Sequence, residues 1–151
     1  MPRFVTERDN IFFKSINEEL LDDVVETLVT LYKISAYDTP ANIYGESTKK
    51  IFYVGVEVAA MIAREQTAPV SYGFGSDTTQ TAIFRFLRTT LEAKEVYPEV
   101  GDFILFNSGY YEIDNANEEQ LIGGQPVYNH SIICATHLTR KSTINIEERP
   151  V

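Results

Sequence analysis

Apolar residues recur at helical spacing near the start of the chain and in strand-like runs after it. Between Asn17 and Tyr32 the apolar positions fall at i, i+4 and i+8, forming one wide stripe. Carboxylates gather early in this segment, where they favour the positive end of a helix dipole, and Lys33 lies near the other end. We therefore predict one long amphipathic helix over Asn17 to Tyr32. Its stripe consists of Leu20, Leu21, Val24, Val25, Leu28, Val29 and Tyr32.

Strand character dominates the rest of the chain. β-Branched and aromatic residues concentrate in several short segments. Two of these segments are separated by Asn107-Ser108-Gly109, which is a hairpin signal. One helical turn is expected over residues 90–96. The expected strands cover residues 51–58, 79–88, 102–106, 110–113 and 130–139.

These elements predict an α+β fold that is mainly β. One long N-terminal amphipathic helix precedes about five strands at hairpin-like spacing, which is typical of a small antiparallel β-barrel or sandwich. No linker or internal repeat divides the sequence, so we expect a single domain over residues 1–151. From Ser142 the sequence becomes polar and charged, and we interpret residues 142–151 as a flexible C-terminal arm.

A glycine-containing segment over residues 66–79 interrupts the strand pattern. Tyr72 and Phe74 alternate there with Gly73 and Gly75. A loop of this length is uncommon inside a compact domain, and long loops often carry function. We therefore predict a long loop and take Tyr72, Gly73, Phe74 and Gly75 as candidates for a functional surface.

Charge and cysteine content narrow the functional classes. The net charge is −9, with 22 acidic against 13 basic residues. Tight nucleic-acid binding requires basic residues to neutralise phosphates, so this balance disfavours it. The single cysteine, Cys134, permits no internal disulfide, and no segment approaches the length of a membrane span. We expect a soluble protein that is cytoplasmic when synthesised.

Residues for catalysis or metal binding are few. His130 and His137 are the only histidines, and no HxH, CxxC or HExxH spacing occurs. Cys134 is interpreted as a buried core residue rather than a nucleophile. No glycine-rich segment continues into a nucleotide-binding motif. We therefore expect no enzyme activity, no metal and no cofactor.

Residues 97–106 form the most recognisable part of the chain. This segment reads Tyr-Pro-Glu-Val-Gly-Asp-Phe-Ile-Leu-Phe, and Tyr-Tyr-Glu-Ile follows at 110–113 and Leu-Ile-Gly-Gly-Gln at 121–125. Earlier pieces are the acidic Leu-Leu-Asp-Asp-Val-Val segment, Asn-Ile-Tyr-Gly-Glu at 42–46 and Gly-Phe-Gly at 73–75. In this order the pieces resemble neck proteins of contractile-tailed bacteriophages, of the head-closure or stopper type.

The hairpin that begins at Gly101 carries the signature of this resemblance. Gly101 can turn the chain into the strand, and Asp102 can accept hydrogen bonds from nearby backbone amides. Residues 103–113 are then expected to form the hairpin that anchors the barrel. Tyr111 and Glu112 complete the candidate hairpin signature.

The resemblance implies a structural role in the virion. A ring, usually of six copies, would close the DNA-filled head beneath the portal and its adaptor and above the tail terminator or tail. The loop over residues 66–79 would face the channel or a neighbouring subunit. An acidic channel surface would let double-stranded DNA pass without specific binding. The protein would be located in the neck of the virion and, during assembly, in the host cytoplasm, with no membrane contact.

Three other functions remain open. A tail terminator or tail-completion ring of the same assembly would also be a small acidic α+β protein. A small-barrel enzyme would need a pocket with convergent ionisable groups. A free-standing binding module would be a stable monomer, whereas a ring subunit should expose apolar surface and associate.

Overall fold

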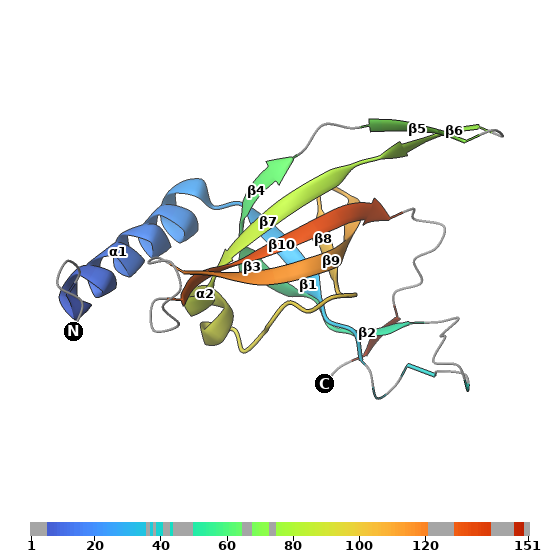
Figure 1. Ribbon diagram of the computed structural model, residues 1–151. Helices are drawn as coiled ribbons and strands as arrows, with labels where there is room; N and C mark the ends of the chain where they lie inside the picture. The colour runs from blue at the N-terminus through green and yellow to red at the C-terminus, as the bar shows by residue number, and fades with distance from the viewer. Residues whose placement is uncertain are drawn as a thin grey trace.

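A computed structural model defines the architecture of the chain (Figure 1). The structure describes residues 6–35, 37, 39, 40, 43, 50–64, 68–72, 75–120, 129–139 and 147–149. Its elements in order are α1 (Glu7–Glu19), the π-helical turn η1 (Leu20–Val25), β1 (Leu28–Tyr32), β2 (Ile51–Tyr53), β3 (Val56–Ala59), β4 (Met61–Arg64), β5 (Ala68–Tyr72), β6 (Gly75–Thr79), β7 (Thr81–Leu87), α2 (Arg88–Ala93), β8 (Phe103–Phe106), β9 (Gly109–Gln120), β10 (Asn129–Thr139) and β11 (Glu147–Arg149). The predicted α+β class, mainly β, is confirmed.

Seven strands form one antiparallel sheet in the order β3-β1-β8-β9-β10-β7-β4. The two outermost strands, β3 and β4, are consecutive in the chain and separated only by Ala60. Ala60 is fully buried, and its amide donates to the carbonyl of Thr27 at 2.9 Å. The sheet therefore curls until its two edges meet at Ala60, giving a small barrel (Figure 1).

Alternation along the strands fills the interior of this barrel. On β7, Ala82, Phe84 and Phe86 are buried, while Arg85 between them is exposed. The ring of Phe84 packs edge-on against Tyr111, with centroids 5.5 Å apart. The interior is a packed core and not a channel, because side chains from all sides meet in it. Its buried members are Val29, Leu31, Val58, Ala60, Ala82, Phe84, Phe86, Leu91, Val96, Ile104, Tyr111, Ile113, Ile132 and Cys134.

The predicted hairpin after Gly101 is confirmed. Strands β8 and β9 pair with Phe106 opposite Gly109. Asn107 and Ser108 make the two-residue turn with φ of 48° and 63°, the left-handed conformation that suits a tight hairpin. The predicted strands at 79–88 and 130–139 correspond to β7 and β10, and the helical turn corresponds to α2.

The predicted bounds of the N-terminal helix were wrong. The helix begins at Glu7, and Leu28–Tyr32 is a strand, β1, between β3 and β8. Val29 and Leu31 point into the barrel at alternate positions, so burial in the sheet outweighed the helical spacing of this segment. Of the predicted stripe, Leu20, Val24, Val25 and Leu28 are exposed instead of packed.

Two other segments also differ from their predictions. The expected strand over residues 51–58 is divided into β2 and β3, and residues 61–64 form a further strand, β4. The expected loop at 66–79 contains a hairpin, β5 and β6, with Tyr72 opposite Gly75. This hairpin is a separate two-stranded sheet that extends beyond the start of β7 (Figure 1). Its glycines suggested a loop because the pattern lacks the apolar alternation of a buried strand.

The C-terminal segment contains a short strand. Glu147–Arg149 forms β11, which pairs in parallel with β2. The other residues of the expected arm, 142–146, 150 and 151, lie outside the described residues. Strand β2 is held to the barrel by a second apolar cluster of Tyr32, Phe52 and Phe103, in which the Phe52 and Phe103 ring centroids are 5.1 Å apart.

Candidate assembly surface

Helix α1 begins with a complete capping box. The Thr6 hydroxyl accepts a hydrogen bond from the amide of Asp9 at 3.3 Å, and the Asp9 carboxylate accepts one from the amide of Thr6 at 3.1 Å. The Thr6 hydroxyl also donates to the Asp9 carboxylate at 2.8 Å, and this bond, followed by the bond from the Thr6 amide, lowers the pKa of Asp9 below its usual range. A capping box satisfies two backbone amides that the first helical turn leaves free, so the local sequence sets where α1 starts.

The apolar side of α1 faces solvent. Another side carries Asn10, which is buried, and the half-buried Lys14 and Asn17, of which Asn17 lines a pocket with Leu87 of the barrel. A surface helix normally turns its apolar stripe to its own core, so α1 has the reverse orientation. The exposed side forms what we call the outer stripe. Its members are Phe12, Phe13, Ile16, Leu20 and Val24, which are 61%, 48%, 44%, 44% and 70% exposed.

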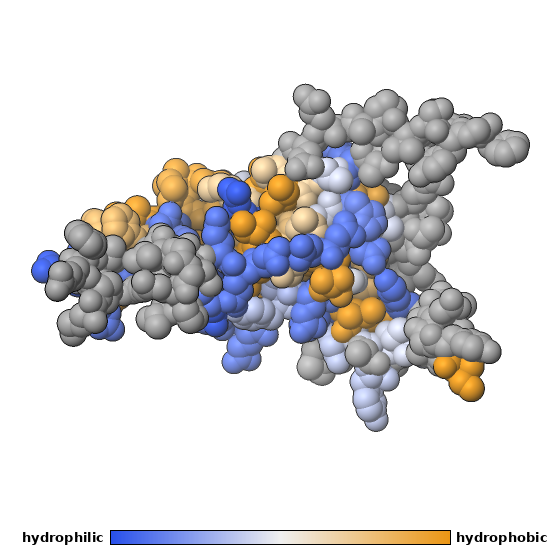
Figure 2. Space-filling view, in the orientation of Figure 1, coloured by the Kyte–Doolittle hydropathy of each residue, from blue (hydrophilic) through white to orange (hydrophobic). Residues whose placement is uncertain are grey.

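The outer stripe is visible as a band of apolar surface along α1 (Figure 2). Phe12, Ile16, Leu20 and Val24 are spaced four residues apart, so they share one face of the helix. The band continues onto Met61 of β4, which is 44% exposed. Monomeric proteins rarely leave a contiguous apolar patch of this kind in water without a partner.

The π-helical turn fixes this orientation. Leu21 is buried against Ala59 and Leu87 of the barrel, whereas its neighbour Leu20 points outward. The turn ends at Glu26, which has a left-handed φ of 46° and donates its amide to the carbonyl of Leu21 at 3.0 Å. Because Leu21 holds one side of the turn, the outer stripe cannot rotate inward without emptying that contact.

A pocket of about 160 Å³ opens beside the outer stripe, between η1 and the barrel. Leu20, Leu21 and Met61 form its apolar wall. Its polar wall includes Glu119 and His130, and Glu119 accepts a hydrogen bond from Ser131 at 3.1 Å. Burial lowers the pKa of His130, and the positive charge of Lys14 lowers it further. The pocket is mixed in character and large enough for one side chain of a partner.

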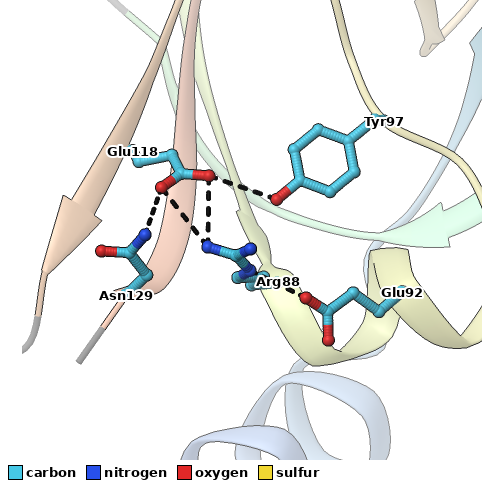
Figure 3. A network of polar contacts seen from close by, with 5 residues as sticks. All are labelled: Arg88, Glu92, Tyr97, Glu118 and Asn129. Carbon is cyan, nitrogen blue, oxygen red and sulfur yellow. Dashed lines mark hydrogen bonds and ion pairs between the residues drawn. The ribbon is translucent and has the colours of Figure 1, made fainter. Parts of the chain in front are cut away.

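Helix α2 directly follows Leu87 of the pocket wall and packs on the barrel core. Leu91 of α2 is fully buried in the core. Arg88 of α2 pairs with Glu92 at 2.8 Å and with Glu118 of β9 at 3.2 Å (Figure 3). Tyr97 donates its hydroxyl hydrogen to Glu118 at 3.2 Å, and Asn129 donates its side-chain amide to the same carboxylate. These contacts tie α2 and the following loop to β9 and β10, so we assign them a structural role.

The hairpin-signature residues come together at the entry to β8. Gly101 has a φ of 94° and donates its amide to the carbonyl of Ile113 at 2.9 Å, and the amide of Ile113 donates to the carbonyl of Asp102 at 2.9 Å. The Asp102 carboxylate is fully buried. Tyr111 is part of the core, and Glu112 forms an ion pair with Lys50 at 3.1 Å. Their contacts are internal to the fold.

The other candidate surface is on the β5–β6 hairpin. Tyr72 ends β5 and Gly75 begins β6, while Gly73 and Phe74 lie outside the described residues. Figure 1 shows this hairpin on the opposite side of the barrel from α1. The hairpin forms a sheet separate from the one that contains β8 and β9, so its candidate residues and the hairpin-signature residues lie on different sheets.

The remaining chemically reactive residues have structural surroundings. Cys134 is fully buried, and burial raises the pKa of its thiol to about 12. His137 contacts the Asp114 carboxylate at 2.8 Å on the barrel exterior. Within the described ranges, no three His, Cys, Asp or Glu side chains are grouped closely enough to hold a metal ion. None of the described helices is long and apolar enough to cross a membrane.

Sequence reasoning missed the outer stripe. Phe12, Phe13 and Ile16 precede the predicted helix, and Leu20 and Val24 were taken to be core residues. The sequence does carry a signal for the stripe, because Phe12 and Ile16 continue the four-residue spacing of Leu20 and Val24 toward the N-terminus. Spacing alone does not say whether an apolar face meets the protein's own core or a partner.

Comparisons with known proteins identify no family for this chain. No protein-family model matches it. A search of curated proteins finds no match either. One solved structure is similar over 74% of this chain and 93% of its own, with 13% sequence identity and a TM-score of 0.48; it is described as the virion of a native gene transfer agent particle. A similarity at this TM-score and identity establishes neither a shared fold nor a shared role.

Proposed function

We propose that this protein is a structural subunit of a tailed-phage neck, a head-closure protein that forms a ring between the filled head and the tail. The observation that carries the proposal is the outer stripe, because its apolar side chains face solvent on a helix anchored in that orientation by Leu21. A subunit that functions within an assembly buries such a surface against its neighbours. A free-standing monomer would leave this apolar face in contact with water.

The order of sequence motifs supports the same proposal. The Gly101-Asp102 entry to the β8–β9 hairpin is where the resemblance to neck proteins is most distinctive. The φ of 94° at Gly101 and the hydrogen bonds that the Asp102 carboxylate accepts from the amides of Ile34 and Glu99 explain why these two residue types suit that entry. The tail terminator remains a second position for the ring within the same neck assembly.

The filled interior of the barrel determines where a DNA channel through the ring could lie. Phe84, Phe86 and Leu91 fill it, so a channel has to form between subunits and not through one barrel. A net charge of −9 suits such a channel, since an acidic wall repels the DNA backbone and leaves the polymer free to slide. We assign the β5–β6 hairpin to the channel or to a neighbouring subunit.

Replacing residues 68–79 by a short turn tests the hairpin assignment. The two strands pair with each other in a sheet of their own, so the barrel should still fold, as circular dichroism can check. Particles carrying the shortened chain should leak DNA or fail to join tails. Unchanged DNA retention and tail joining would remove the hairpin from the proposal.

Cryo-electron microscopy of phage particles that contain this chain tests the function itself. The expected result is a ring of this subunit between the adaptor and the tail. A ring at the upper end of the tail tube, below a separate closure protein, would instead identify a terminator. Absence from the particle would overturn the structural role.

A further inference from the structure

The outer stripe is large enough for a complete protein interface. A large apolar residue offers on the order of 200 Å² of surface. The five stripe residues, with Val25 and Met61 beside them, are 41–70% exposed, so they leave on the order of 700 Å² uncovered. Each partner in a standard interface contributes about 800 Å². The uncovered area therefore matches one side of a stable contact.

Charge along the helix limits which partner can cover the stripe. Residues 7–14 of α1 carry Arg8 and Lys14 beside Glu7 and Asp9, and are neutral as a whole. From Ser15 to Glu26, the residue that caps η1, every charged residue is acidic. These are Glu18, Glu19, Asp22, Asp23 and Glu26. Two such helices in parallel contact would bring their acidic halves together, and like charges at close range are destabilising.

An antiparallel pair of helices would avoid that repulsion, but it has a different limit. Such a pair is two-fold symmetric and uses the same surface on both copies, so association stops at a dimer. A closed ring requires a contact between two different surfaces of the same chain. On the proposed ring function, the partner of the stripe is therefore a surface outside α1.

We infer that the outer stripe packs against the barrel of the neighbouring copy of this chain and is the main contact that closes the ring. The pocket beside Leu20 and Met61 adds an anchor point. Its volume of about 160 Å³ is similar to that of a cavity, about 150 Å³, that accepts a benzene ring. An aliphatic or aromatic side chain of the neighbour fits this space, as expected for the buried centre of an interface. This inference rests on the proposed ring but assigns the surface that forms it.

Site-specific photo-crosslinking in assembled particles tests the inference. A benzophenone amino acid replaces Phe13 on the stripe or, as a matched control, Glu18 on the same helix. Both positions are exposed, but Glu18 lies off the stripe. After irradiation, peptide mass spectrometry identifies the captured chain. We expect the Phe13 probe to capture a barrel peptide of a second copy, and the Glu18 probe to capture none.

Each other result overturns the inference. Capture of α1 from a second copy would mean a two-fold helix pair. Capture of a different virion protein, or of nothing, would assign the stripe to another function. If the chain is missing from the particles, the proposed function is wrong, and the inference needs its own test. The Phe13 probe is then irradiated in the concentrated purified protein. Capture of a barrel peptide from a second copy would support the inference, and no capture would overturn it. A Phe13→Ser variant, which leaves the buried contacts intact, should weaken ring association about tenfold or more.

Discussion

The carboxylate of Asp102 accepts a hydrogen bond of 2.9 Å from the amide of Ile34, 68 residues earlier in the chain. Its second oxygen accepts another from the amide of Glu99, also at 2.9 Å. The first bond ties the entry to β8 to the segment that leaves β1, and the second closes the turn before β8. One buried side chain thus extends the connection between β1 and β8 beyond their last strand pair, Tyr32 opposite Phe103, and joins it to the turn at Glu99.

Replacing Asp102 by alanine should remove this connection. The amides of Ile34 and Glu99 would lose their acceptors, and unsatisfied buried donors are costly. We expect Asp102→Ala to lower the free energy of unfolding by about 2–4 kcal/mol, measured by urea denaturation. Glu99→Gln is the control, because the exposed ion pair of Glu99 with Lys33 at 3.2 Å should contribute less than about 1 kcal/mol. Equal effects of the two substitutions would contradict the assigned role.

The pH dependence of stability should report the ionisation of Asp102. Burial raises its pKa above 3.8, despite the opposing effects of the bonds from Ile34 and Glu99 and of the Lys33 charge. A carboxyl whose pKa is raised by folding contributes stability below its unfolded pKa and loses it as the pH rises through the folded pKa. The stability of the wild type relative to Asp102→Asn should therefore fall as the pH rises above 3.8. A relative stability that rises with pH would show that the hydrogen bonds outweigh burial.

Cys134 should be unreactive in the folded protein. With its thiol pKa raised to about 12, roughly one molecule in ten thousand carries a thiolate at pH 8, and the side chain lies inside the barrel. Alkylation monitored by mass spectrometry should proceed only when denaturant opens the barrel. The adjacent Ala135 is exposed on the outer side of β10, so the Cys134→Ala/Ala135→Cys variant should react at once. Rapid labelling of native Cys134 would contradict the packing of the core.

Leu20 and Leu21 offer a matched pair at the end of the helix. Leu21 is 5% exposed and packs on the barrel, whereas Leu20 is 44% exposed. Leu21→Ala should lower the free energy of unfolding by about 2–3 kcal/mol through the cavity that it leaves. Leu20→Ala should cost less than about 1 kcal/mol in the same urea experiment. A larger loss for Leu20 would mean that η1 packs in a different orientation.

The barrel was largely predictable from the sequence because its strands follow local rules. The β8–β9 hairpin has apolar runs on both sides of Asn107-Ser108-Gly109, and β7 alternates around Arg85. Cys134 was expected in the core and lies there. In each case the residue type, its spacing and its burial agree, so local pattern and tertiary packing lead to the same element.

The bounds of the N-terminal helix were not predictable because the same four-residue apolar spacing runs through a helix and into a strand. Leu20, Val24 and Leu28 share the four-residue spacing, yet the first two lie on a helix and Leu28 begins a strand. The spacing method assumes that apolar residues face the protein's own core, and here the outer stripe faces away. The candidate assembly surface could therefore emerge only once the burial of Asn10 and Leu21 was known.

The closure of the sheet at Ala60 limits edge-to-edge strand pairing between copies of the chain. Strands β3 and β4 are four residues long, and they are the only outer strands of the seven-stranded sheet. Lys94 also donates to the backbone carbonyl of Glu57 on β3, placing a charged side chain at that edge. Both edges are short and Lys94 covers the edge of β3, so they give another chain little to extend by strand addition. Copies at high local concentration are thus directed away from open-ended β-fibres and toward contacts made by side chains.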